Sequence, residues 1–198
     1  SRDYLHTIQT NGTLINDEWC KFFLRNNFLV GVSVDGPEDL HDRHRRNWGG
    51  GGSFASTMRG LRLLQNYGVD FTPICVLTRD SLDHPDEIFD FFVDNGFPAV
   101  AFNVEEIEAA NTRSTLLDDA SFPETRRRYA RFWQRITERW LGSGGRLRVR
   151  EIDTQGQLIL SRKASPRYSP MQDVNRGLRV ITVCHDGSLF TFSPELSS

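Results

Sequence analysis

"LVGVSVDGPEDLHDRHRR", residues 29–46, begins as an apolar strand and ends in a dense run of charged and imidazole side chains. With Phe28 added, the run 28–34 is too evenly apolar for a sheet that has one face in water, which favours a parallel strand. Ser33 interrupts this strand two residues before Asp35-Gly36-Pro37, a strong turn signal. A simple turn does not need the charge that follows. We therefore expect the strand end to contribute to a site for a polar ligand that carries a carboxylate.

Strand-like and helix-like stretches alternate on both sides of this segment. Strands are expected at 4–9, 28–34, 69–78 and 98–104, separated by helices at 16–27, 53–68 and 84–96. Such alternation predicts βα units around a parallel sheet, either closed into a barrel or open and doubly wound. In both architectures ligands bind beyond the carboxyl ends of the strands. Those ends read QTNG (9–12), SVDGP (33–37), TRDS (78–81) and NVEE (103–106), four polar stretches on one rim.

Local signals set the helix ends and mark one irregular strand. Asn16 or Asp17 is the expected N-cap of the first helix, and Ser53 that of the second. Gly68 is expected to end the second helix in a left-handed conformation. Pro73 lies inside a strand and favours a bulge or another sheet irregularity there.

The second half of the chain changes character. Residues 123–145 predict a long helix with aromatic side chains on one face and arginines on the other, and 146–152 predict another strand. The arginine face admits two interpretations, a solvated outer surface or a nucleic-acid contact. Residues 178–192 contain two β-rich runs around Asp186-Gly187, which is a hairpin signal. A domain boundary is expected between 164 and 177.

Composition limits the class of protein. The chain has 198 residues, 38% hydrophobic and 25% charged, and its 24 basic residues nearly balance 26 acidic ones. A net charge of −2 argues against a nucleic-acid or membrane partner, and no apolar run has the length of a membrane span. Three separated cysteines fit a reducing compartment, so we expect a cytoplasmic protein. The chain begins at Ser1 inside a strand pattern and stops just after another, so we expect it to be a fragment.

Several stretches resemble a known family. The segments 8–23, 26–45 and 66–78 are similar to radical S-adenosylmethionine (SAM) maturases of the anaerobic sulfatase-maturase type. The ending DGSLFTFSPEL (186–196) resembles SPASM peptide maturases that form cyclophane crosslinks in ribosomally made peptides, including glycine-rich-repeat precursors.

The resemblance implies a fold and an activity. Residues 1–163 would be an α/β domain, a partial parallel (β/α) barrel lacking its first strands. Residues 164–198 would be a linker and the β-hairpin that begins a SPASM-like region. The complete enzyme would cleave SAM at a 4Fe-4S cluster and abstract hydrogen from a ribosomal precursor peptide, with electrons from a donor such as flavodoxin or ferredoxin.

The resemblance also implies site residues. Ser33 would contact the SAM ribose, and Arg45 would bind the SAM carboxylate through its planar guanidinium. The main chain of Asn103 and Val104 would lie along the adenine. The catalytic base is not assigned.

The chain departs from the family pattern at the cluster. The motif Cys-x3-Cys-x2-Cys is absent from these residues, and its ligands are expected upstream, so the fragment alone should be inactive. Cys184 in the expected hairpin is a weak candidate for an auxiliary cluster ligand. A catalytically dead remnant, or a peptide-binding module without the iron–sulfur motif, is therefore the alternative to an enzyme.

Ordinary structural roles compete with each assignment. Ser33 is also explained as a packing residue bonded to its own backbone, and Arg45 as a surface cation. His41 and His44 are spaced as possible metal ligands but fit solvated or structural side chains better. An unrelated barrel enzyme would use acid–base chemistry from Asp35, Glu105 and Glu106. An aldolase would need a lysine at a strand end, where neither Lys21 nor Lys163 lies.

Overall fold

The computed structural model describes residues 6–105, 113–116, 122–160, 182–183 and 188–190. The chain divides into two compact units, one containing residues 1–105 and 114–151 and the other residues 106–113 and 152–198.

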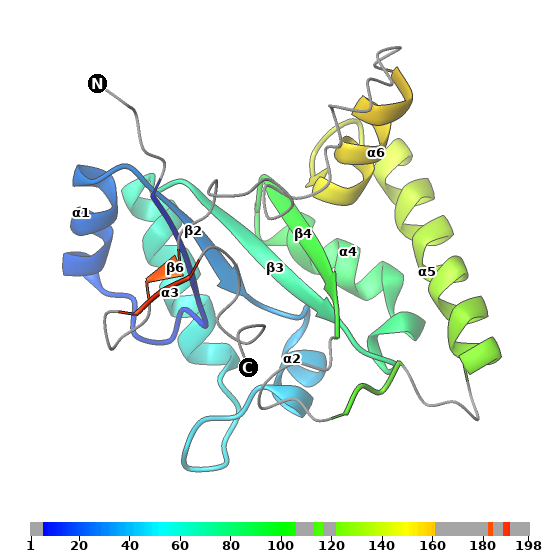
Figure 1. The fold of residues 1–198 in the computed structure, drawn as a ribbon, viewed down its shortest axis with the longest axis horizontal. Coiled ribbons are helices and arrows are strands. Elements are labelled where there is room, and N and C mark those ends of the chain that lie inside the picture. Colours follow the sequence, from blue (N-terminus) through cyan, green and yellow to red (C-terminus); the bar gives the residue numbers. More distant parts are fainter. Residues whose placement is uncertain (1–5, 106–112, 117–121, 161–181, 184–187, 191–198) are drawn as a thin grey trace. The chain divides into compact units, whose positions relative to one another are not determined.

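The first unit contains a parallel sheet of five strands in sequence order (Figure 1). Neighbouring strands pair in parallel throughout. This arrangement confirms the expected βα units and parallel sheet. The strands are β1 (His6–Thr10), β2 (Phe28–Ser33), β3 (Phe71–Leu77), β4 (Ala99–Val104) and β5 (Arg148–Val149).

Helices connect the strands and end where local chemistry predicts. They are α1 (Asp17–Arg25), α2 (Glu38–His44), α3 (Phe54–Tyr67), the short 3-10 helix η1 (Ser81–Asp83), α4 (Pro85–Asp94) and α5 (Phe122–Gly142). Asn16 caps α1, since its Oδ1 accepts a hydrogen bond from Trp19 N at 3.0 Å. Gly68 ends α3 at φ 68°, where a side chain would be strained. Both local predictions are confirmed.

The two faces of the sheet are not equally covered. In β2, Val30 and Val32 are completely buried, whereas the alternate residues Gly31 and Ser33 are half-buried. The apolar sequence of β2 predicted two buried faces, and the structure shows that the face with Gly31 and Ser33 is only half-buried. Gly31 allows a close approach on that face, because an added Cβ would lie 2.8 Å from Ile74 Cδ1.

Pro73 causes no bulge, contrary to the sequence expectation. It pairs in regular register with Val32. Val34 N donates to Ile74 O at 2.9 Å, so Ile74 faces β2 and Pro73, one residue earlier, faces the β4 side. The β3–β4 pairing begins only at Ile74, so the missing N–H of Pro73 breaks no hydrogen bond there.

The apolar face of α5 packs on the sheet domain. Phe132 and Ile136 are fully buried, and the Phe132 ring meets the Phe102 ring of β4 edge to face at 5.8 Å. Figure 1 shows α5 running alongside α4, which it contacts. The predicted aromatic face of this helix is confirmed.

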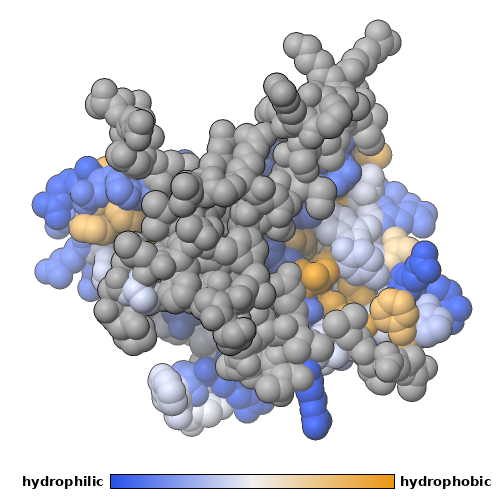
Figure 2. Space-filling view, in the orientation of Figure 1, coloured by the Kyte–Doolittle hydropathy of each residue, from blue (hydrophilic) through white to orange (hydrophobic). Residues whose placement is uncertain are grey.

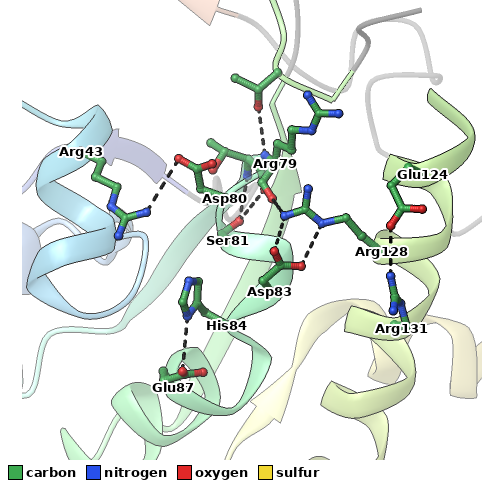
Figure 3. Close-up of polar contacts among 12 residues, drawn as sticks. Arg43, Arg79, Asp80, Ser81, Asp83, His84, Glu87, Glu124, Arg128 and Arg131 are labelled. Atoms are coloured by element: carbon green, nitrogen blue, oxygen red, sulfur yellow. Dashed lines mark hydrogen bonds and ion pairs between the residues drawn. The ribbon is translucent and has the colours of Figure 1, made fainter. Parts of the chain in front are cut away.

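Three arginines of α5 meet acidic side chains of neighbouring elements. Figure 3 shows Arg128 reaching from α5 to the carboxylate of Asp83 in η1 and to the carbonyl of Arg79. Arg135 and Arg139 both pair with Asp86, and Arg139 also pairs with Asp90. These pairs give this part of the arginine face a role in helix packing, which weakens its interpretation as a nucleic-acid contact.

The strand expected at 146–152 is largely wrong. Only Arg148 and Val149 form β5, and α6 (Arg150–Leu160) begins at the next residue. Leu147 and Val149 are buried and alternate as in a strand, which explains the sequence pattern. The side chains of Arg150 and Glu151 then make the contacts to β4 that further strand residues would have made.

In the second unit, β6 (Thr182–Val183) and β7 (Leu189–Phe190) pair antiparallel, with Thr182 opposite Phe190. This confirms the predicted hairpin, whose turn at Asp186-Gly187 lies outside the described residues. The boundary at 163/164 and the SPASM-like region stay predictions, because 161–181 also lie outside them.

Where described residues form the surface seen in Figure 2, it is mainly hydrophilic with smaller hydrophobic patches. No helix in the part of the chain that the structure describes is long and apolar enough to cross a membrane.

Candidate functional site at the carboxyl ends of the strands

Asp35 and Arg45 form a two-point ion pair just beyond β2. The residue Asp35 is 5% exposed, and its carboxylate accepts hydrogen bonds from Arg45 Nε at 2.5 Å and Nη2 at 3.1 Å. Its Oδ1 also accepts from Val76 N at 2.9 Å, where β2 has already left the sheet. The Arg45 side chain keeps a quarter of its surface exposed. Among the described residues, Arg45 uses Nε and Nη2 in this pair, and none accepts a hydrogen bond from its Nη1.

A buried histidine fixes the main chain around this ion pair. Asp35 N donates to His41 Nδ1 at 3.3 Å, so the imidazole proton lies on Nε2, which donates to Ser53 Oγ at 3.0 Å. Ser53 Oγ in turn donates to Arg45 O at 3.1 Å. Burial lowers the pKa of His41, and the nearby Asp35 carboxylate opposes this shift only in part. A neutral His41 imidazole therefore connects Asp35 to Ser53, on either side of Arg45 in the chain.

This assigns His41 a structural role. The structure does not gather it with His44, which is exposed and lies 3.8 Å from Asp80. The expected side-chain cap from Ser53 is also corrected, since its hydroxyl is used by His41 and Arg45.

Asp42 caps α3 in place of Ser53. Its Oδ1 accepts from Phe54 N at 2.9 Å, and an anion at a helix N-terminus is also favoured by the helix dipole. Gly52 makes this approach possible, because a Cβ at Gly52 would lie 1.8 Å from Asp42 Oδ2. The charged run after β2 thus has defined structural tasks that fold it back against α3.

Ser33 and Asn103 lie on the same face of the sheet. Ser33 pairs in register with Ile74, and Val76, two residues further along β3, pairs with Asn103. Because β3 lies between β2 and β4, Ser33 and Asn103 are two strand spacings apart, about 10 Å across the sheet. Ser33 is half-buried, and no described residue accepts from or donates to its hydroxyl. The alternative of a Ser33 side chain bonded to its own backbone is not what the structure contains.

The end of β4 carries the other two predicted residues. Asn103 is exposed, and its Oδ1 accepts from Arg150 Nη2 at 2.7 Å. Val104 is 40% exposed, and strand alternation places it on the opposite face from Asn103. The structure therefore brings Ser33, Arg45 and Asn103 to one end of the sheet, with Val104 available there through its main chain. Their ligand contacts stay predictions.

The carboxylates of the rival acid–base interpretation are occupied. Glu105 Oε2 accepts from Thr115 N at 2.5 Å, Thr115 Oγ1 at 2.7 Å and Ser114 Oγ at 3.2 Å. Asp35 is held by Arg45 and Val76. Glu106 lies outside the described residues. The two described carboxylates thus hold loops in place, which does not favour a pair working on a substrate.

Described cysteines form no cluster. Cys20 and Cys75 are fully buried free thiols, and burial raises the pKa of both. No group of three or more His, Cys, Asp or Glu side chains placed to hold a metal ion occurs among the described residues. These residues do not fit a 4Fe-4S cluster. Cys184, the weak auxiliary candidate, lies outside the described part of the chain.

Lysine chemistry finds no support at this end of the sheet. Lys21 is an exposed residue within α1 and does not stand at a strand end, and Lys163 lies outside the described residues.

Residues 1–92 match the model of the Radical SAM superfamily. An uncharacterized protein of Synechocystis sp. is 41% identical over 191 residues, which cover 96% of this chain and 46% of that protein. The serine-type anaerobic sulfatase-maturating enzyme of Bacteroides thetaiotaomicron is 47% identical over 85 residues, 43% of this chain and 20% of that enzyme. The chain thus spans about half, or less, of the length of these relatives.

The fold has solved counterparts. The structure of native anSMEcpe with bound AdoMet and Kp18Cys peptide is similar at a TM-score of 0.70 and 27% sequence identity, covering 96% of this chain and 51% of that one. This likeness confirms the α/β fold with a partial-barrel parallel sheet. Residues 1–92 are therefore part of a radical SAM domain, and the anaerobic sulfatase-maturating enzymes are among the homologues of the chain.

Proposed function

We propose that the complete protein, meaning this chain with any further sequence that its gene encodes, is a radical SAM enzyme that crosslinks a ribosomally made peptide. The matched Radical SAM model and the sulfatase-maturating relatives support radical chemistry on a polypeptide. The similar structure that holds AdoMet and a peptide supports both ligands. The crosslink itself, of the cyclophane type, rests on the resemblance of residues 186–196.

The observation that carries the SAM site is the ion pair of Asp35 and Arg45. A partly exposed guanidinium, fixed through Nε and Nη2, offers its remaining edge to a carboxylate without first losing rotamer freedom. Ser33, the half-buried last residue of β2, offers a hydroxyl to the ribose. Asn103 and Val104 offer main-chain groups to the adenine. Together they suit a ligand with a carboxylate at one end and a nucleoside at the other.

The proposal includes a 4Fe-4S cluster that described residues do not hold, so its ligands are assigned to sequence outside this chain. Such a cluster would supply one electron for the cleavage of SAM to methionine and a 5′-deoxyadenosyl radical, and the radical would take a hydrogen atom from the peptide. A reductant such as flavodoxin or ferredoxin is the proposed electron source. The residues of this chain bind and orient SAM in that scheme.

The test is an anaerobic assay of the complete protein after reconstitution with iron and sulfide. SAM, dithionite and the precursor peptide are added, and 5′-deoxyadenosine and peptide mass are followed. We expect 5′-deoxyadenosine and a peptide that has lost hydrogen. S-adenosylhomocysteine, which has no sulfonium to cleave, is the control and should give neither product.

Two outcomes contradict this proposal. A reconstituted protein that forms no 5′-deoxyadenosine is not a radical SAM enzyme, and peptide binding without SAM cleavage would support the peptide-binding module instead. A peptide changed without loss of hydrogen would exclude crosslinking.

A further inference from the structure

β4 has a neighbouring strand on its β5 side for only the first part of its length. β5 pairs with Ala99 and Val100 and then stops, because α6 begins at Arg150. Continued pairing would place residue 151 opposite Phe102. Because β5 stops before this point, the main chain of Phe102 has no strand partner on that side, although the residue is only 4% exposed. A buried amide without a partner is costly, so something else must take these hydrogen bonds.

Two side chains take them. Glu151 Oε2 accepts from Phe102 N at 3.0 Å, and Arg150 Nη2 donates to Phe102 O at 3.0 Å. Arg150 and Glu151 are also paired with each other, with Nε 2.6 Å from Oε1. One carboxylate and one guanidinium thus extend the edge of β4 where the neighbouring main chain has turned away.

An arginine–carboxylate pair also fixes the main chain at the end of β2. Where β2 leaves β3, the Asp35 carboxylate accepts from Val76 N and is paired with Arg45. Both strand ends that carry the proposed ligand site are therefore fixed by an arginine–carboxylate pair. At β2 the arginine of the pair is itself a proposed ligand contact. At β4 the ligand contact is the residue that the arginine orients.

That residue is Asn103. Arg150 Nη2 donates to Asn103 Oδ1 at 2.7 Å, and a guanidinium has no acceptor, so the amide oxygen must face Arg150. The Nδ2 group then points away from Arg150 and presents two N–H donors from an exposed position. No described residue accepts from Nδ2. Without Arg150 this exposed side chain would rotate and present oxygen and nitrogen indiscriminately.

We propose that Arg150 and Glu151 are positioning residues that fix the end of β4 and orient the Asn103 amide, so that Asn103 Nδ2 donates to an acceptor atom of the adenosyl group of SAM. The inference rests on the proposed function for the identity of the ligand. It adds a side-chain contact and the pair that sets it.

Asn103→Asp separates this role from simple stabilisation. An aspartate at this position pairs better with Arg150, so the melting temperature should stay equal or rise, whereas the N–H donors are lost. We expect SAM affinity of the complete protein, measured by calorimetry, to fall by roughly tenfold. Arg150→Ala should weaken SAM binding to a similar extent. Arg146→Ala is the control, since Arg146 bonds only the nearby Ser143 carbonyl at 3.1 Å among described residues.

Glu151 is tested by rescue. Glu151→Leu removes the acceptor for Phe102 N, so amide exchange at Phe102 should accelerate and SAM affinity should fall by several-fold. Glu151→Gln keeps an acceptor oxygen and should restore most of both.

The results of these experiments test this inference separately from the proposed function. Unchanged SAM affinity in Asn103→Asp, beside a normal wild type, would overturn the Asn103 contact while leaving the proposed function standing. Equal rates of amide exchange at Phe102 in Glu151→Leu and Glu151→Gln would show that Glu151 does not hold the Phe102 amide at the edge of β4. A wild type that binds no SAM would overturn the proposed function and the ligand contact together.

Discussion

The Asp35 carboxylate and the Arg45 guanidinium face each other through two contacts, Oδ2–Nε at 2.5 Å and Oδ1–Nη2 at 3.1 Å. Because Asp35 also accepts from Val76 N, Asp35→Asn turns a donor toward either Arg45 or Val76 and leaves a poorly matched buried group. The free energy of unfolding should fall by about 2–4 kcal/mol in urea titrations. Asp39→Asn is the matched control, since Asp39 is exposed and lies 3.7 Å from Arg43, and should cost less than about 1 kcal/mol. Equal losses in the two variants would contradict the structural importance of the pair.

Ser33→Ala tests the half-buried hydroxyl at the end of β2. The change would remove the proposed neutral hydrogen bond to the ligand, worth about 1 kcal/mol, so SAM affinity should fall about fivefold with little change in stability. Equilibrium dialysis with the complete protein measures the affinity. Ser56→Ala, which removes a hydroxyl bonded to Ser53 O at 2.8 Å, should bind SAM as the wild type does. Wild-type affinity in Ser33→Ala would exclude the ribose contact.

His41 should make the fold sensitive to acid. Its pKa is lowered in the folded protein by burial, whereas an unfolded histidine has a pKa of about 6.5. Between these two values the unfolded state binds more protons, so stability is complete above about pH 7 and is lost as the pH falls through 6.5 toward the folded pKa. The loss per pH unit is at most about 1.4 kcal/mol.

Urea titrations between about pH 7.5 and 5.5 measure this slope. His41→Gln should be less stable at neutral pH and should show a shallower slope than the wild type. Asp35, Asp42 and Arg45 are the charged groups facing His41 and are present in both proteins. Parallel slopes would show that His41 is not the group that titrates.

Gly52→Ala tests the close approach of Asp42 to α3. An added Cβ would lie 1.8 Å from Asp42 Oδ2, so the carboxylate must move and the hydrogen bond from Phe54 N is lost. Thermal or chemical denaturation should show a cost of about 1–3 kcal/mol. Gly49→Ala in the same loop meets Asn47 Oδ1 at 3.3 Å and should change stability by less than about 0.5 kcal/mol. A neutral Gly52→Ala would mean that α3 does not depend on this cap.

Local chemistry predicted most of the sheet domain. The alternation of strands and helices, Asn16 as a cap and Gly68 as a helix end depend on neighbours in sequence, and each was found in the structure. The start of α6 was not predictable in this way. Arg150 and Glu151 leave the strand because their side chains bond Phe102, nearly fifty residues earlier, and no local pattern reports such a contact.

The positions of the candidate site residues in the fold could be predicted from the sequence, whereas the contacts that connect them could not. The position of Ser33 at the end of a strand, and of Arg45 after the turn, could be read from sequence. The sequence favoured a solvated or structural His41, and the structure supports the structural role, because His41 is fully buried and bonded to Ser53, twelve residues away. Asp35 was considered as an acid–base group, and its role as the partner of Arg45 depends on the fold of α2 between them.

We propose that the end of this sheet binds SAM through Arg45, and a calorimetric titration of SAM into the complete protein tests this contact most directly. Arg45→Ala removes a charge-assisted contact worth about 1.5–3 kcal/mol, so affinity should fall by roughly 10- to 150-fold. Arg46→Ala, one residue away and exposed, should leave affinity unchanged. Equal SAM affinity in the wild type and in a folded Arg45→Ala protein would contradict the account.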